Sequence, residues 1–245
     1  MKDGLELACR FALPPNSKSY CGKPSFRRAF AKYLEDRNLR NRHNLERELE
    51  KFVAHNAYLS LIASCCGLHK FDWRVADAFW IGNALLEQVG REKIAKMIER
   101  SFSKKGMLSA SRAKALAKGI PDRVYAHHSF HVFYLHSISG AVKPSLKNAD
   151  SCRISWGRVA CLQDGKAILE SQRIAKKNGK VRLERCKKAV LLSCQGIPLA
   201  ENIRKGDWLA CHWGYAVLKI TRRQAQQLER YTKANLGLLS CKQKA

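Results

Sequence analysis

The spacing of apolar residues changes near residue 150, and this change limits the fold classes open to the chain. Before it, apolar side chains recur at the three- and four-residue intervals of helices. After it, short β-forming runs alternate with the dipeptides Asp164-Gly165 and Asn178-Gly179, both strong hairpin signals. The sequence therefore predicts an α+β protein, with an N-terminal α-helical domain followed by a small OB-like β-barrel and a C-terminal helix.

The first half of the chain is expected to form a series of helices. They cover residues 6–13, 24–35, 44–63, 73–89, 91–102 and 109–118. The first should stop at Pro14-Pro15, because proline cannot continue a helix. Asp72 is the expected N-cap of the fourth, and Gly82 within that helix costs about 1 kcal/mol relative to alanine, which indicates close packing. We assign this α-helical domain to residues 1–140.

The second domain is assigned to residues 150–240. Its expected strands are 153–162, 166–174, 180–194, 208–213 and 215–220, and residues 195–205 form a loop. Thr221 and Gln224 have the spacing of a capping box, in which each side chain bonds to the other residue's backbone N–H. The terminal helix is therefore expected to begin directly after the last strand.

A histidine-rich segment, residues 125–136, ends the first domain. It holds four of the eight histidines in the chain. Its aromatic and β-branched content favours extended structure. If it were instead a helix, His127 and His131 would lie one turn apart and share a metal, with His128 beside them. Two interpretations stay open: the rings bond to backbone at a domain junction, or they contact a metal or cofactor.

Composition restricts the partners and the compartment. Lys and Arg number 46 against 20 Asp and Glu, a formal charge of +26, which favours an acidic protein or nucleic acid as partner. Trp156, Trp208 and Trp213 are then candidates for base stacking. The ten cysteines contain no Cys-x-x-Cys, so we expect thiols and not a disulfide framework. No apolar run is long enough to cross a bilayer and no export signal is evident, so a cytoplasmic protein is expected.

Two segments carry a family resemblance. Cys152-Arg153-Ile154-Ser155-Trp156-Gly157-Arg158-Val159 and Gly206-Asp207-Trp208-Leu209-Ala210-Cys211-His212-Trp213-Gly214-Tyr215-Ala216 resemble the HypC/HupF chaperones of [NiFe]-hydrogenase maturation. The whole chain is also similar to the uncharacterised DUF6390 family, through residues 7–11, 79–83 and 127–131. The first resemblance implies that Cys152 and His212 transiently hold iron, shared with a HypD-like partner, and that no catalytic residue is needed.

The match to the chaperones has two departures. Their cysteine is the mature N-terminus, whereas Cys152 lies inside the chain, and their Pro-Gly is Trp156-Gly157 here. The chemistry nevertheless suits a soft metal, because a thiolate and a neutral imidazole are good ligands for one, and Arg153 is expected to favour the thiolate. Three function classes follow: a metallocentre carrier without turnover, a nucleic-acid binder that uses the barrel, and a metal-dependent enzyme that uses the 127–131 histidines. In the alternative interpretation, Cys152 and His212 are simply packed side chains.

Overall fold

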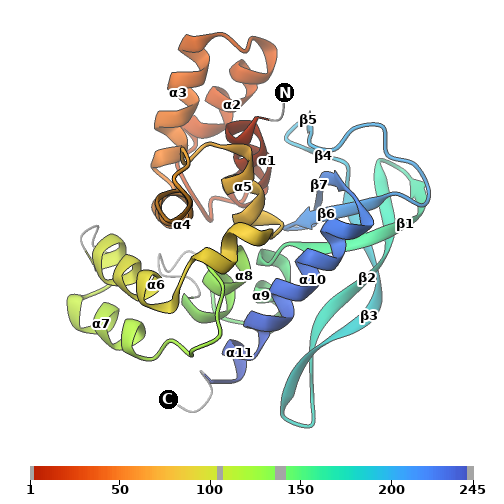
Figure 1. The fold of residues 1–245 in the computed structure, drawn as a ribbon. Coiled ribbons are helices and arrows are strands. Elements are labelled where there is room, and N and C mark those ends of the chain that lie inside the picture. Colours follow the sequence, from red (N-terminus) through yellow and green to blue (C-terminus); the bar gives the residue numbers. More distant parts are fainter. Residues whose placement is uncertain (1–2, 104–106, 136–141, 242–245) are drawn as a thin grey trace. The chain divides into compact units, whose positions relative to one another are not determined.

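The computed structural model describes residues 3–103, 107–135 and 142–241, with side-chain surroundings up to residue 239. The described residues form two compact units. One lies within residues 3–126, and the other comprises residues 127–135 together with 142–241. The histidine-rich segment thus groups with the second unit, and the domain limits 1–140 and 150–240 stay a prediction. Helices and a five-strand sheet occur together (Figure 1), so the chain is of the α+β class.

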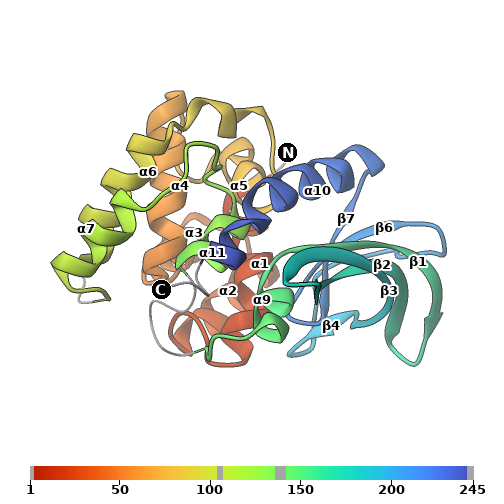
Figure 2. The same ribbon diagram turned by 90° about the horizontal axis from the view of Figure 1, so that it is seen from below.

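The first unit is helical, as predicted. Its elements are α1 (Gly4–Ser17), α2 (Ser25–Glu35), α3 (Leu39–Glu50), α4 (Val53–Cys66), α5 (Trp73–Trp80), the 3₁₀ turn η1 (Ala84–Gln88), α6 (Arg91–Met97), the π-helical turn η2 (Ile98–Phe102) and α7 (Ala110–Lys118). Asp72 and Ser109 cap α5 and α7, because their side chains accept backbone N–H groups at the helix start. Helix α4 contacts both α5 and α6 (Figure 2).

Three predicted helix boundaries are wrong. The helix expected at 44–63 is two helices, separated at Lys51 and Phe52, because the Phe52 ring turns aside to meet Phe26 edge-on at 4.8 Å. The helix expected at 73–89 ends at Trp80, and Gly82 has a φ of 98°, which a right-handed helix excludes. Helix α1 instead continues through Pro14 and Pro15, which retain their carbonyl groups as acceptors for the last turn.

A buried histidine lies in the core of the first unit. The His55 ring stacks on Trp80 at 5.3 Å and meets Phe79 edge-on at 5.5 Å. Within the described residues, neither ring nitrogen has a hydrogen-bond partner. Burial lowers the pKa of His55 from 6.5 to about 3, because the apolar surroundings disfavour the charged imidazolium. The ring is therefore neutral in the folded unit at physiological pH.

Replacing His55 by phenylalanine is expected to reduce the acid sensitivity of the first unit. The unfolded chain takes up this proton near pH 6.5 but the folded chain only near pH 3, so this group removes stability as the pH falls between those values. By pH 5 the loss is about 2 kcal/mol. Urea unfolding followed by circular dichroism at pH 7.5 and pH 5 measures it for wild type and His55→Phe. Equal pH dependence in the two proteins would contradict the assignment, because carboxylate contributions cancel in the comparison.

The second unit begins with short helices. They are α8 (His128–Phe130), the π-helical turn η3 (His131–Leu135) and α9 (Leu146–Cys152). The extended structure predicted for 125–136 is therefore wrong for residues 128–135, whereas His127 has extended backbone and His136 lies outside the described residues. The prediction failed because a local β-preference is weak: here Phe130, Val132 and Phe133 are buried in a packed core that a helical turn forms equally well.

A five-strand sheet follows, with the strand order β1-β2-β3-β7-β6. The strands are β1 (Ser155–Gln163), β2 (Lys166–Lys177), β3 (Lys180–Leu191), β6 (Trp208–His212) and β7 (Tyr215–Ile220), and a separate pair is formed by β4 (Ser193–Cys194) and β5 (Ile197–Pro198). Strand β1 pairs with both β2 and β6, whereas the single pair Leu191–Tyr215 joins β3 to β7. The OB-like closure depends on that one pair and stays a prediction.

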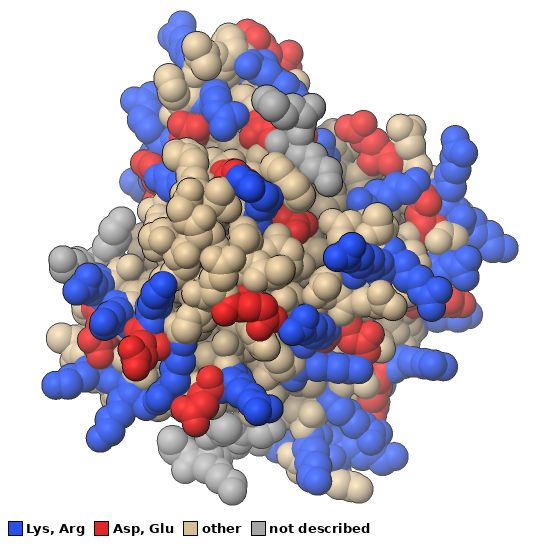
Figure 3. Space-filling view, viewed as in Figure 1, with Lys and Arg blue, Asp and Glu red and all other residues tan. Residues whose placement is uncertain are grey.

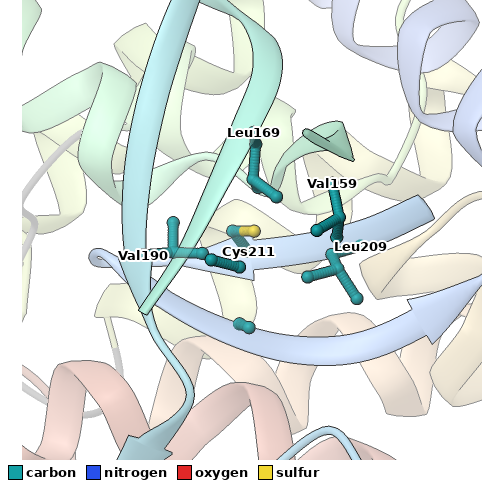
Figure 4. Packing of buried hydrophobic residues seen from close by; sticks show 7 residues of the cluster. Val159, Leu169, Val190, Leu209 and Cys211 are labelled. Atoms are coloured by element: carbon teal, nitrogen blue, oxygen red, sulfur yellow. The ribbon is translucent and has the colours of Figure 1, made fainter. Parts of the chain in front are cut away.

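The predicted hairpin turns are confirmed. Asp164-Gly165 and Asn178-Gly179 have positive φ at both positions, the requirement of a type I′ turn, and they join β1 to β2 and β2 to β3. Inward-facing side chains of the strands form the sheet core (Figure 4), which comprises Val159, Ala167, Leu169, Val190, Leu209, Cys211 and Ala216.

Helix α10 (Arg222–Leu236) follows β7, and α11 (Leu238–Cys241) ends the described chain. The capping box is present as predicted: the Gln224 N–H bonds to Thr221 Oγ1 at 3.2 Å, and Gln224 Oε1 accepts the Thr221 N–H at 3.0 Å. Helix α10 contacts α8, β1 and β6 and buries Leu228 and Tyr231. It therefore holds the histidine-rich segment beside one end of the sheet.

Candidate metal centre

Three possible metal ligands from separate elements meet in the second unit. His128 begins α8, Cys152 ends α9, and His212 ends β6. One donor atom from each lies within 4.8 Å of the other two. Within the described part of the chain this is the one cluster of three or more such residues. The two histidines are buried, with 6% and 1% of their surfaces exposed, whereas Cys152 is partly exposed. An ion would therefore enter from the cysteine side.

The His128 ring is oriented by the backbone at the end of α9. Its Nε2 lies 2.9 Å from the carbonyl oxygen of Cys152. Because a carbonyl oxygen only accepts, Nε2 carries the proton, and the lone pair of the neutral ring is on Nδ1. Metal-bound histidines commonly donate their second N–H to a backbone carbonyl in this way, which sets the tautomer and the direction of the ring.

Burial keeps the His128 imidazole in the neutral form that binds metals. The pKa of His128 is well below its usual value, chiefly because burial disfavours the cation and secondarily because His212 and His131 are close by. The His128 and His212 rings meet edge-on with their centroids 5.2 Å apart. A neutral imidazole is the metal-binding form, so no proton has to be removed from His128 at neutral pH before an ion binds.

Cys152 is positioned by an ionic clamp on α9. Asp150 accepts from Arg153 Nε at 2.9 Å and from the Ile174 N–H of β2 at 2.9 Å. Arg153 is completely buried and also donates to the Gln172 carbonyl at 2.6 Å. Its guanidinium therefore serves the clamp, and its expected effect on the Cys152 thiol stays a prediction. The clamp ties the end of α9 to β2.

His212 is positioned by a tight turn. The two residues between β6 and β7, Trp213 and Gly214, have φ values of 50° and 85°. Such values are costly for tryptophan, by about 1–3 kcal/mol, and persist only where the surroundings demand them. Here the Trp213 N–H donates to the Ser151 carbonyl of α9 at 2.9 Å. The turn is thereby fastened to the residue before Cys152, which places His212 beside the thiol.

The remaining predicted site residues lie elsewhere in the second unit. His127 faces α10: its ring stacks on Tyr231 with centroids 6.0 Å apart, and its Nδ1 accepts the Ser129 N–H, which caps α8. His131 stacks against His128 at 6.3 Å and so borders the cluster. Of the three histidines at 127–131, only His128 belongs to the cluster of possible ligands found among the described residues.

The three tryptophans proposed for base stacking differ in accessibility. Trp156 is 5% exposed, and Arg153 covers its ring at 5.4 Å. Trp213 is 8% exposed, whereas Trp208 is half-buried. Only a ring with a solvent-facing side stacks on a base. Of the three, Trp208 alone has an appreciable exposed surface.

The sequence did not indicate that His128, and not only His212, is the neighbour of Cys152. The only signal was the density of histidines in residues 127–131. Their grouping with Cys152 depends on how α8, α9 and β6 pack, and no local spacing encodes that arrangement. None of the helices formed by the described residues combines the length and apolar character needed to span a bilayer.

The fold and the cluster together define an α+β protein in which a cysteine and two histidines from separate elements converge. Residues 1–245 match the model of a family of unknown function, DUF6390. The chain belongs to that family. No curated protein matches the chain, and no solved structure matches it either.

Proposed function

We propose that the second unit is a metal-carrying module that binds a soft divalent ion through Cys152, His212 and His128 and delivers it to a partner protein. The observation that carries the proposal is the meeting of the three donors at one end of the sheet. A thiolate with two imidazoles suits iron(II), zinc and related ions and disfavours magnesium or calcium, which prefer oxygen ligands.

A bound ion would draw the donors closer together. Metal–nitrogen bonds of about 2.1 Å and metal–sulfur bonds of about 2.3 Å, at tetrahedral angles, place two donors about 3.5 Å apart. The donor atoms of the cluster lie within 4.8 Å of one another. Binding therefore requires the donors to close by up to about 1 Å, and rotation of the partly exposed Cys152 side chain supplies part of this movement.

Three protein donors leave a tetrahedral ion one open position, as in sites that exchange ligands. A carrier needs such a position, because a donor from the receiving protein must bind before the carrier's own ligands leave. The partial exposure of Cys152 puts this exchange on the solvent side of the cluster. The arrangement thus favours transfer over permanent storage.

The finer proposal is that the unit is a HypC/HupF-like OB barrel carrying iron for a HypD-like maturation partner. Its support is the segment 206–216, which supplies β6, His212 and the following turn, together with the proximity of His212 to Cys152. An internal cysteine at a helix end lacks the free amine of that family. In this chain His128 supplies a nitrogen donor in its place.

The nucleic-acid alternative has less support. Trp156 and Trp213 are buried. In Figure 3, Lys and Arg side chains are spread around the visible face with acidic side chains among them, and much of its centre is uncharged. Such a distribution of charge predicts only nonspecific binding of nucleic acid, with an affinity that falls steeply as the salt concentration rises. A catalytic role for the 127–131 histidines is weakened because His127 faces Tyr231.

Anaerobic titration with cobalt(II) and iron(II) tests the proposal. We expect one equivalent to bind, and the cobalt form to show thiolate-to-metal charge-transfer absorption. Cys152→Ala should abolish that absorption, and both Cys152→Ala and His212→Ala should lower affinity by about 100-fold or more, beyond the 10–100-fold typical of residues that only orient ligands.

Cys161→Ala is the matched control, because Cys161 is an exposed thiol on β1 of the same unit. It should leave both absorption and affinity unchanged. Equal effects of the Cys161 and Cys152 substitutions, or no stoichiometric binding by wild type, would refute the metal site. If the protein binds the metal but the metal-loaded protein does not bind a HypD-like protein, only the finer proposal is refuted.

A further inference from the structure

A groove of about 600 Å³ lies in the first unit, between α4 on one side and α6 with η2 on the other. Its residues on α4 recur at three- and four-residue intervals from Val53 to Ser64, and those on the second wall recur in the same way from Lys93 to Ser101. Each wall is therefore one continuous helix face. The exposed side chains along both rims show that the groove opens to solvent.

The two walls differ in charge. Lys93, Lys96 and Arg100 line one rim and are exposed, and within the described residues none of them forms an ion pair. The facing rim carries the small polar side chains Asn56, Ser60 and Ser64. No acidic side chain among the described residues lines the groove. The lining thus presents three cations in a row without a carboxylate among them.

The floor between these rims is apolar. Ala57 and Met97 are buried there, and Val53 and Leu61 are half-buried. A helix advances about 1.5 Å per residue along its axis. The rim from Asn56 to Ser64 is therefore about 12 Å long, and the rim from Lys93 to Arg100 is about 10 Å long. These lengths correspond to about two helical turns. Methionine in the floor adapts to differently shaped apolar side chains.

We infer that this groove docks an acidic amphipathic helix of a partner protein. Two turns of such a helix place apolar side chains at i, i+3, i+4 and i+7 on the floor, the usual anchors of a helix bound in a groove. Glutamate or aspartate beside that stripe meets Lys93, Lys96 and Arg100. Lys93, Lys96 and Arg100 are separated by three and four residues. Carboxylates on one face of a docked helix have the same spacing along its axis, so each can meet one cation.

The distribution of charge favours a helix over a fatty acid. A fatty acid has one carboxylate at the end of an apolar chain and requires one cation at the end of an enclosed tunnel. Here three cations follow the length of an open groove. A row of positive charges beside an apolar strip complements a row of negative charges beside an apolar stripe, and this complementarity would also set the direction of docking.

A labelled 16-residue peptide provides the test. It is designed as a helix with leucine at i, i+3, i+4 and i+7 and glutamate on the flanking positions, and its binding to the full chain is followed by fluorescence anisotropy. We expect saturable one-to-one binding, which Lys96→Glu with Arg100→Glu weakens at least about tenfold. Leu61→Asp should weaken it as well, because it charges the apolar floor. A peptide with lysine in place of each glutamate should not bind.

The matched control is Lys114→Glu with Lys118→Glu. These exposed residues of α7 lie outside the groove, and the substitution changes the net charge by the same amount. Affinity should then stay within about twofold of wild type. Equal weakening by both double substitutions, or no saturable binding of the acidic peptide, would overturn the inference. Binding of sodium dodecanoate in its place, lost on Lys96→Glu with Arg100→Glu, would overturn it in favour of a lipid site.

Discussion

Replacing Asp150 by alanine is expected to destabilise the second unit by about 3–5 kcal/mol, the usual cost of removing one partner of a buried ion pair. Arg153 has no exposed surface, and Asp150 accepts from its guanidinium at 2.8 and 2.9 Å. Without the carboxylate, a buried cation keeps the Gln172 carbonyl as its principal partner. The Ile174 N–H loses its acceptor as well. Urea unfolding of wild type and Asp150→Ala measures the difference.

Two further variants distinguish the effect of the Asp150–Arg153 ion pair on stability from the effect of losing side-chain contacts. Asp150→Leu combined with Arg153→Met should cost much less than Asp150→Ala, because apolar side chains leave no buried charge. Glu184→Ala is the matched control: Glu184 pairs with Arg182 on the exposed surface of β3 at 2.7 Å, where solvent screens the interaction, so little loss is expected. If Asp150→Ala were no more disruptive than Glu184→Ala, the clamp would not stabilise the unit.

The parts of the fold that the sequence predicted are those set by local chemistry. Type I′ turns require positive φ, so Asp164-Gly165 and Asn178-Gly179 marked two hairpins. The capping box at Thr221 marked the start of α10 in the same way. In each case the information lies within four residues. Tertiary packing does not have to be known.

The parts that failed are those decided by tertiary contacts. Residues 44–63 have helical spacing throughout, yet the chain breaks at Phe52 so that its ring can pack on Phe26. The histidine-rich segment has β-forming residues, yet it is helical where it packs in the second unit. For the site, the resemblance paired Cys152 with His212, but the contribution of His128 depends on a bond to a carbonyl 24 residues away.

A second large effect is expected from His128. If it is a metal ligand, His128→Gln should lower the affinity for cobalt(II) or iron(II) by about 100-fold or more, comparable to the loss from His212→Ala. Glutamine reaches as far as histidine Nε2 and keeps an N–H that can donate to the Cys152 carbonyl, the role His128 Nε2 has now. Its amide oxygen is a poor ligand for a soft ion. The substitution therefore removes the ligand while retaining the hydrogen bond that orients the end of α9.

His127→Asn is the matched control for that measurement. His127 lies next to His128 and is also buried, but its Nδ1 caps α8 by accepting the Ser129 N–H. Asparagine is a favoured N-cap, so the helix start is preserved, and His127 is not one of the three clustered donors. Affinity should stay within about threefold of wild type. If His128→Gln also stayed within threefold while His212→Ala did not, the ion would be held by Cys152 and His212 alone, as in the two-ligand arrangement the resemblance implies. A loss shared by His128 and His212 but not His127 would require the three-donor centre.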